Sequence, residues 1–230
     1  MDRVKQFDLA DTCVRDVNHY LHRELASDAP DRIEILNPDG LHSIAAGMDH
    51  EIQVDIRGHA GYFTAGMNKH ASVTIHGNVG WSVAENIMSG RVHVRGHASE
   101  CAAASGHGGL VVIDGNASSR CGISMKGCDI VVAGNVGHFS AFMAQAGTLV
   151  VCGDAGQHLG DSLYEATIYV AGALHGLGAD AQVEPMQDAD YQQVERLLAS
   201  ADVDHDIREF KRVASARSLY HWNANAHQEY

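Results

Sequence analysis

The sequence predicts an all-β protein: a right-handed parallel β-helix of about seven 19-residue coils, with short α-helical flanks at both termini. The first observation is a glycine that recurs every 19 residues, at Gly58, Gly77, Gly96, Gly115, Gly134, Gly153 and Gly172. The second is a pair of apolar positions at a fixed distance before this glycine. A period near 20 residues is typical of stacked repeats, in which each unit buries its inner face against its neighbours.

Each repeat begins with a short strand that ends at the glycine. The position four residues before the glycine is always apolar: Val54, Val73, Val92, Val111, Ile130, Leu149 and Ile168. The position two residues before it is apolar as well: Ile56, Ile75, Val94, Ile113, Val132, Val151 and Val170. Alternating β-branched residues indicate a strand with one buried face, and stacking its copies forms a parallel sheet.

The glycine itself is expected to form a corner. The residue after it is mostly His, Asn or Asp, and these types tolerate a left-handed backbone. If the corner is left-handed, Gly115→Val destabilises the protein by about 1–3 kcal/mol. Small residues seven positions after the glycine predict two further short extended pieces around a narrow interior. A β-helix of the acyltransferase type fits poorly, because three hexapeptides fall one residue short of the 19-residue period.

The regular pattern covers only the middle of the chain. The chain therefore divides into an N-terminal helix and cap over 1–50, the β-helix over 51–180, and a C-terminal helical tail over 181–230. Within the first part, the run Asn37-Pro38-Asp39-Gly40 predicts a turn.

Three helices are expected in the flanks. Apolar residues at helical spacing predict one over 7–25, with Asp8 or Asp11 as its N-cap. Residues 188–201 and 204–220 also have helical patterns. These flanks are expected to cap the solenoid, whose terminal coils otherwise expose sheet edges and core.

Composition and charge exclude several functional classes. The 230 residues include 16 Lys and Arg against 29 Asp and Glu, which gives a formal net charge of −13. This balance argues against nucleic-acid binding and against a polybasic membrane anchor. No apolar run approaches the ~20 residues of a membrane helix, and the N-terminus lacks the apolar core of a signal peptide. Five cysteines without a CxxC pair indicate a reduced, cytoplasmic protein.

The histidines, cysteines and glycine-rich corners are the first candidates for a functional site. The sixteen histidines include His59 and His97 at the same corner position, but these lie two coils apart, and surface and corner histidines are the default interpretation. Four cysteines occupy different positions of the repeat, which indicates small buried residues and no iron–sulfur cluster in this chain. The corners at 134–138 and 153–156 lack the nucleotide-binding motifs.

The acidic residues Asp154, Asp161 and Glu165 share one late coil and are interpreted as turn residues and rim charges, and a carboxylate pair for catalysis is the alternative. We assign no catalytic, cofactor-binding or metal-binding residue to this chain. Lys126, Asp161 and Glu165 are the candidate contacts with a partner. A solenoid without a catalytic constellation is typical of a binding or scaffold unit.

The stretch from residue 121 to 172 resembles the C-terminal β-helix of the glutamate synthase large subunit, known for its GXGXG repeat. The matching runs are 124–127 (SMKG), 143–147 (MAQAG), 151–156 (VCGDAG) and 160–166 (GDSLYEA). As a free-standing chain, the sequence is similar to the small middle subunit of N-methylglutamate synthase. Further support comes from 61–68 (GYFTAGMN), 84–90 (AENIMSG) and 215–220 (SARSLY). The resemblance covers about 7–222 and departs from the glycine pattern at Ser99, Ser118 and His175.

The resemblance implies a non-catalytic scaffold subunit of an FMN-dependent enzyme complex. That complex makes N-methylglutamate from glutamate and methylamine, a reaction of methylamine metabolism. The implied partners are an amidotransferase-like subunit and an FMN-containing, glutamate-synthase-like subunit that also holds any iron–sulfur cluster. Two alternatives share the fold: a glutamine-dependent, glutamate-synthase-like complex, and a formyltransferase/hydrolase complex of the formylmethanofuran dehydrogenase type. A further alternative is an independent β-helix enzyme that uses a metal.

Overall fold

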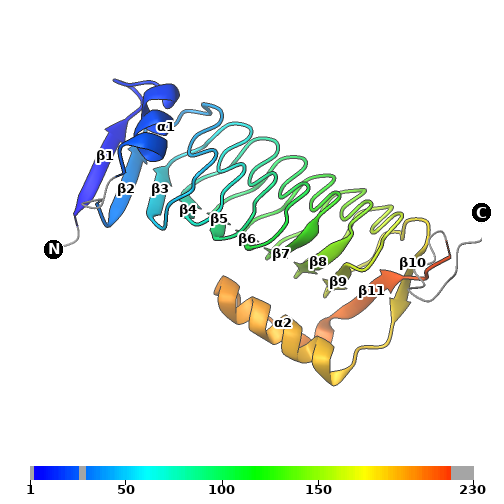
Figure 1. Cartoon of the computed structure of the whole chain (residues 1–230). Helices are drawn as coiled ribbons and strands as arrows, with labels where there is room; N and C mark the ends of the chain where they lie inside the picture. Colours follow the sequence, from blue (N-terminus) through cyan, green and yellow to red (C-terminus); the bar gives the residue numbers. More distant parts are fainter. Residues whose placement is uncertain (1–2, 26–29, 219–230) are drawn as a thin grey trace, which may run out of the picture.

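A computed structural model describes residues 3–25 and 30–218 and shows one long solenoid whose strands form a single 11-stranded sheet (Figure 1). The predicted parallel β-helix of about seven coils is confirmed. The strands run in the order β1-β2-β3-β4-β5-β6-β7-β8-β9-β11-β10. Their bounds are β1 (Val4–Asp8), β2 (Arg32–Leu36), β3 (Gln53–Arg57), β4 (Ser72–Ile75), β5 (Arg91–Val94), β6 (Leu110–Ile113), β7 (Lys126–Val132), β8 (Ala146–Val151), β9 (Thr167–Val170), β10 (Ala181–Glu184) and β11 (Lys211–Ser215).

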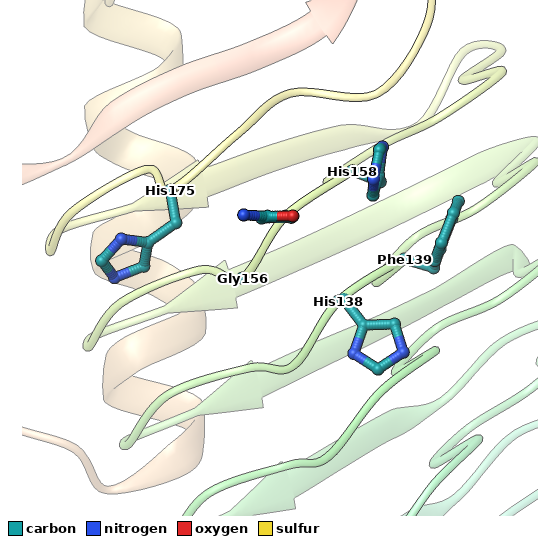
Figure 2. A pocket seen from close by; sticks show the side chains of 6 residues that line it. His138, Phe139, Gly156, His158 and His175 are labelled. Atoms are coloured by element: carbon teal, nitrogen blue, oxygen red, sulfur yellow. The ribbon is translucent and has the colours of Figure 1, made fainter.

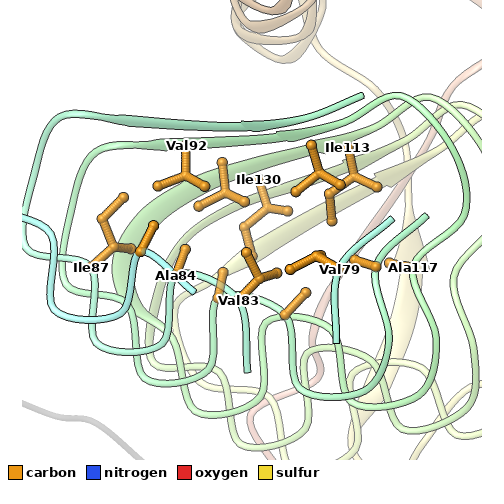
Figure 3. Packing of buried hydrophobic residues seen from close by; sticks show 14 of the residues in the cluster. Val79, Val83, Ala84, Ile87, Val92, Ile113, Ala117 and Ile130 are labelled. Carbon is orange, nitrogen blue, oxygen red and sulfur yellow. The ribbon is translucent and has the colours of Figure 1, made fainter. Parts of the chain in front are cut away.

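Strands β3 to β9 place each repeat directly above the previous one. Val73 pairs with Val92, and Val92 pairs with Val111, so the register follows the 19-residue period. The apolar positions four and two residues before the glycine point inward and are buried in every coil. They meet a second ladder one residue wide, in which Ala60, Val79, Ala98, Ala117, Val136, Ala155 and Leu174 pair in sequence. Figure 3 shows the resulting core, with Val92, Ile113 and Ile130 facing Val79 and Ala117.

The rest of each coil differs from the expected extended pieces. The residues five, seven and nine positions after the glycine mostly have left-handed backbones, for example Ser82, Ala84 and Asn86 with φ of 59°, 55° and 54°. Ala84 is fully buried, as are Ala65 and Ala103 at the same position. The small residues at this position are therefore required by a left-handed, buried backbone. Of the two further extended pieces expected in each coil, the structure has one, the one-residue ladder, and turns replace the other.

The corner glycines are not left-handed, with Gly58 (φ 144°) as the exception among them. Glycine is needed at these corners for another reason: adjacent coils approach each other so closely that no side chain fits between them. A Cβ on Gly115 would lie 2.8 Å from the carbonyl oxygen of Gly96 and would also collide with Nδ1 of His97. That carbonyl accepts a hydrogen bond of 3.0 Å from the N–H of Gly115. The corner conformation was predicted wrongly, but glycine is required there because any side chain would force the coils apart.

The His, Asn and Asp residues after these glycines hold the corners together. Each side chain accepts a hydrogen bond from the backbone N–H one coil later. The N–H of Asn116 donates to Nδ1 of His97 (2.9 Å), and the N–H of Asn135 donates to Oδ1 of Asn116 (2.9 Å). The same bond joins Asn78 to His59, His97 to Asn78, Asp154 to Asn135 and Ala173 to Asp154. The acceptor role of Nδ1 requires the Nε2–H tautomer of His59 and His97.

The N-terminal flank holds a strand as well as a helix. Helix α1 spans Val14–Arg23, so the helix predicted over 7–25 begins too early. Its N-cap is Cys13, and neither Asp8 nor Asp11 caps it. Oδ1 of Asp8 instead accepts hydrogen bonds from the N–H of Ala10 (2.9 Å) and from Nδ2 of Asn37 (2.7 Å). Residues before the helix form β1, because pairing with β2 satisfies a backbone edge that a longer helix would leave open.

The turn expected at Asn37-Pro38-Asp39-Gly40 is present, with positive φ at Asn37 (50°), Asp39 (39°) and Gly40 (74°). Residues after it form the loops of the first coil.

The C-terminal flank confirms one predicted helix and corrects the other. Helix α2 spans Asp188–Ala201, the range that the sequence predicts. Residues predicted as a helix over 204–220 instead form a short 3₁₀ turn, η1 (Ile207–Glu209), followed by β11. The last two residues of that prediction, 219–220, lie outside the described residues. Strand β11 pairs antiparallel with β9 and with β10, so it covers the edge that β9 would otherwise expose.

Helix α2 lies alongside the sheet and does not cap its end (Figure 1). It packs on the outer face of the sheet through Val194, Leu197 and Leu198. The sheet residues beneath are the outward ones: Val112, Val131, Val150 and Tyr169. Outward positions of earlier strands are polar, as at Asp55 and Thr74. The expectation that the helical tail caps the solenoid was therefore wrong for α2, while α1 does lie at the N-terminal end.

Candidate functional site: partner-binding surfaces

The loop face is the side of the solenoid formed by the segments that run from each corner to the following strand. Six of the eight large hydrophobic residues that are exposed among the described residues lie here, five of them in the first three coils and the sixth, Met143, farther along. We call the group of five the N-terminal apolar patch, and it consists of Leu41, Tyr62, Met67, Trp81 and Met88. Trp81 is 63% exposed and Tyr62 is 51% exposed. Exposed apolar residues gathered on one face mark interaction sites in proteins.

The stacking of the coils brings the aromatic residues of this patch together. Tyr62 and Trp81 occupy the same repeat position, four residues after the glycine, on adjacent coils. The N–H of Phe63 donates to the carbonyl oxygen of Trp81 (2.8 Å), which fixes the two loops against each other. The ring centroids of His42 and Tyr62 lie 4.1 Å apart. Tyr62 and Trp81 therefore form a short column, while Leu41, Met67 and Met88 occupy other positions of the same loops.

A polar stretch follows on the next two coils. Here Glu100 and Arg120 lie 4.0 Å apart, and Ser105 and Ser124 occupy positions where the patch has Met67. This stretch lies between the N-terminal apolar patch and a groove on the same face.

This groove is shallow and has a volume of about 690 Å³, and we call it the histidine groove. It is lined by His138, Phe139, Gly156, Gln157, His158 and His175. Figure 2 shows the rings of Phe139 and His158 lying parallel on adjacent coils, and their centroids are 4.6 Å apart. Nε2 of His175 lies 3.7 Å from a carboxylate oxygen of Asp154. The loop face thus carries two surfaces of different chemistry.

The three candidate partner contacts lie toward the C-terminal half of the solenoid. Lys126 pairs with Ala146 of the next coil, and the N–H of Glu165 donates to the carbonyl oxygen of Gln145 one coil further on. Lys126 is exposed at the start of β7. Glu165 is exposed before β9, 3.5 Å from Arg217. Asp161 is used within the fold, because its carboxylate accepts hydrogen bonds from the hydroxyl of Ser162 (2.9 Å) and the N–H of Ala179 (3.2 Å). Lys126 and Glu165 stay predictions as contacts, while Asp161 has an evident structural role.

Buried cysteines do not suit a metal or cluster. Burial raises the pKa of Cys121 and Cys128 to about 12 and that of Cys152 to about 11. Iron–sulfur ligation requires thiolates, which these pKa values disfavour. Within residues 3–25 and 30–218, no three His, Cys, Asp or Glu side chains are grouped so that they could hold a metal ion.

The glycine-rich corners do not provide a phosphate site. Their N–H groups already donate to the coil before, as the N–H of Gly134 does to the carbonyl oxygen of Gly115 (3.1 Å). A phosphate loop needs such donors to be unpaired and converging. The corner hydrogen bonds therefore have a structural role.

One histidine of the sheet, His93, is expected to make the stability of the folded protein depend on pH. His93 points outward from β5 yet is only 4% exposed, and its Nε2 lies 2.6 Å from Oδ1 of Asp114. Nearby, Arg95 contacts the other oxygen of Asp114 (3.2 Å), and Arg91 donates to the carbonyl oxygen of Ser200 in α2 (2.6 Å). Burial lowers the pKa of His93; Asp114 opposes this shift, while Arg95 and Arg91 add to it. Burial therefore favours the neutral form of this ring in the folded protein.

We expect this group to make the folded protein less stable as pH falls through the ordinary histidine range. A histidine whose pKa is lower in the folded state binds fewer protons there than in the unfolded chain, so acid favours unfolding. The contribution of one such group is at most about 1.4 kcal/mol per pH unit. Denaturant unfolding of the wild type and of His93→Gln between pH 7.5 and 5 measures it. The variant is expected to have the shallower pH dependence; equal slopes would contradict the assignment.

Comparison with known proteins places the chain in a family. No protein-family model matches it. It is 53% identical over 218 residues to Protein GlxC of Rhizobium meliloti (strain 1021). The aligned residues cover 94% of this chain and 95% of GlxC. The chain belongs to the GlxC family. The matched region includes parts of both flanks as well as the solenoid, because so little of either chain is left out.

A solved structure shares the fold of this GlxC-family chain. It is a chain in the X-ray crystal structure of the formyltransferase/hydrolase complex (FhcABCD) from Methylorubrum extorquens in complex with methylofuran. The TM-score is 0.65, with 19% identity over 85% of this chain and 80% of that one. This similarity shows the β-helix fold.

No helix in the described part of the chain is both long and apolar enough to cross a membrane.

The apolar patch was missed in the sequence, although a signal for it was present. The position four residues after the glycine holds Tyr62 and Trp81 in two coils but Glu100 and Ser119 in the next two. An aromatic residue at a position that is otherwise polar indicates an exposed site. Recognising it required knowing that this position points outward, which the loop conformation decides.

Proposed function

We propose that this GlxC-family chain is a non-catalytic scaffold subunit of a multi-chain enzyme. The observation that carries the proposal is the loop face, where the N-terminal apolar patch and the histidine groove are held on a rigid solenoid, separated by a polar stretch. Two distinct surfaces at a fixed separation suit a subunit that positions two other chains. The crystal structure with the same fold is that of a complex of several chains, which supports this role.

In finer detail, we propose a cytoplasmic, FMN-dependent, glutamate-synthase-like complex, namely N-methylglutamate synthase. The support is the resemblance of the runs at 151–156 and 160–166 to the β-helix of glutamate synthase. The proposed partners are an amidotransferase-like chain and an FMN-containing synthase-like chain. FMN and an iron–sulfur cluster are assigned to the second partner, and the buried, protonated cysteines of this chain agree with that assignment. The solenoid would hold the two catalytic chains in register for amine transfer.

Affinity purification of the tagged chain from its own host tests the proposal. The expected result is co-purification of an amidotransferase-like chain and a flavin-containing chain, with turnover of methylamine and glutamate by the complex and none by the lone chain. Turnover by the lone chain would contradict the scaffold role. A complex that uses glutamine and 2-oxoglutarate but not methylamine would identify the glutamine-dependent alternative.

A second candidate is a subunit of a formyltransferase/hydrolase complex. The shared fold with a chain of FhcABCD favours it. This candidate predicts a purified complex without flavin absorbance and with a metal-dependent, amidohydrolase-like partner. The absorbance spectrum of the purified complex therefore separates the two candidates.

A further inference from the structure

We propose that the N-terminal apolar patch binds a segment of one partner chain that is apolar at its centre and rich in Lys or Arg at its rim, and that it does not bind a second copy of this chain. This inference rests on the proposed scaffold function and adds the surface and the chemistry of its occupant. The patch consists of Leu41, Tyr62, Met67, Trp81 and Met88 on the first three coils.

The patch residues are exposed where the fold does not need them. The cores of the same coils are filled by other side chains, such as Ile44, Val83 and Ile87, which are fully buried. Trp81 remains 63% exposed and Tyr62 51% exposed, although both rings are large and apolar. Trp, Tyr and Met are enriched in the centres of protein interfaces, where a few aromatic residues supply most of the binding energy.

The charges around the patch select the partner. The loop segments of the first four coils (37–52, 58–71, 77–90 and 96–109) carry the acidic residues Asp39, Asp49, Glu51, Glu85 and Glu100 against one basic residue, Lys69. Nζ of Lys69 lies 2.9 Å from Asp49, and Arg120 of the next coil lies 4.0 Å from Glu100, so two of the five carboxylates already have cationic partners. Asp39, Glu51 and Glu85 supply the remaining negative charge. An apolar centre with an acidic rim is complementary to an apolar segment flanked by basic residues.

The same charges disfavour self-association through this surface. Each copy has a formal net charge of −13, and a symmetric contact would bring two acidic rims together. Like charges facing each other across an interface cost several kcal/mol. The patch therefore fits a hetero-partner better than a second copy.

The histidine groove does not compete for this assignment. Its aromatic side chains Phe139 and His158 already stack on each other, and the Asp154 carboxylate beside it lies 3.7 Å from Nε2 of His175. The two surfaces are therefore expected to contact different partner segments.

Co-expression with the amidotransferase-like and FMN-containing chains of the same host provides the test. In the reconstituted complex, Trp81→Ala is expected to raise the dissociation constant for one partner chain at least tenfold, while the other partner is retained. Glu85→Lys is expected to weaken the same interaction, and added salt should reduce the difference between Glu85→Lys and the wild type. The melting temperature should stay unchanged in both variants, because both side chains extend from the loop face. Val183→Ala, which alters a 52% exposed apolar residue on β10, is the matched control and should bind normally.

A photo-crosslinker identifies the occupant directly. With Trp81→p-benzoylphenylalanine in the complex, the crosslinked peptide is expected to be apolar with flanking Lys or Arg. A crosslink to an acidic segment, or to a second copy of this chain, would overturn the inference. A complex that forms normally with Trp81→Ala would overturn it as well, while leaving the scaffold function intact. Failure of the wild type to bind either chain would instead overturn the proposed function.

Discussion

Gly115→Val is expected to lower the free energy of unfolding by about 3 kcal/mol. The Cβ alone would lie 2.8 Å from the carbonyl oxygen of Gly96, and the branched side chain adds further collisions with the ring of His97. Relief requires adjacent coils to separate, which would weaken the bond from the N–H of Asn116 to His97 and strain the neighbouring sheet pairs. Chemical denaturation followed by circular dichroism measures the effect.

Gly176→Ala is the matched control. A Cβ at Gly176 would have its nearest neighbour at 3.6 Å, which is an ordinary contact. Its stability is expected to stay within about 0.5 kcal/mol of the wild type. If Gly115→Val were as stable as this control, the close approach of the coils could not be the reason for the glycine period.

Leu197→Ala is expected to cost about 3 kcal/mol, concentrated in the C-terminal tail. Leu197 is 1% exposed and packs with Val194 and Leu198 against the outward valines of the sheet. Removing its side chain leaves a cavity under α2 that the rigid sheet cannot fill. Hydrogen exchange of residues 188–215 is expected to accelerate, whereas the amides of β3 and β4, which lie beyond the strands that α2 contacts, should keep their protection.

Glu195→Ala alters an exposed residue of the same helix and should leave both the exchange rates and the stability unchanged. Uniformly faster exchange in Leu197→Ala, including β3 and β4, would show that the tail and the solenoid unfold as one unit. That result would contradict a separately docked helix.

Polar contacts along α2 explain why the tail adopts one position. The phenolic hydroxyl of Tyr169 donates to Asp190 (2.6 Å), and burial and this carboxylate both raise the pKa of Tyr169. Arg212 of β11 contacts the same carboxylate (3.1 Å), so one acidic residue joins the helix to both β9 and β11. The outward apolar residues of β6 to β9 supply the contact area with α2. The hydrogen bonds of Asp190 fix the position of the helix along these strands.

Several features could be predicted from residues that lie close together in the sequence. The period of the glycine, the inward apolar pairs such as Val92 and Val94, and helix α2 all follow from local patterns. Outward Val112, Val131 and Val150 were also visible as apolar positions, yet their meaning depended on a helix some forty or more residues away. The tail strand β11 could not be predicted locally, because its segment forms a strand only where β9 offers an unpaired edge.

The candidate site divides in the same way. The sequence shows that Tyr62 and Trp81 share a repeat position, and it indicates the acidic balance around them. It does not show that this position is exposed, since the left-handed loop residues decide which side chains point outward. Lys126, Asp161 and Glu165 were chosen for their charge, and the structure gives Asp161 a role within the last coil.

By itself, the sequence determined the repeat length, the stacked β-helix and the inward faces of its strands, because each coil repeats the same local pattern and pairs with its own copy. Only the tertiary structure decided the cause of the glycine requirement, the position of the tail and the exposure of the N-terminal apolar patch. These depend on distances between coils and on contacts between distant segments. Such contacts arise from packing in three dimensions, and no local period records them.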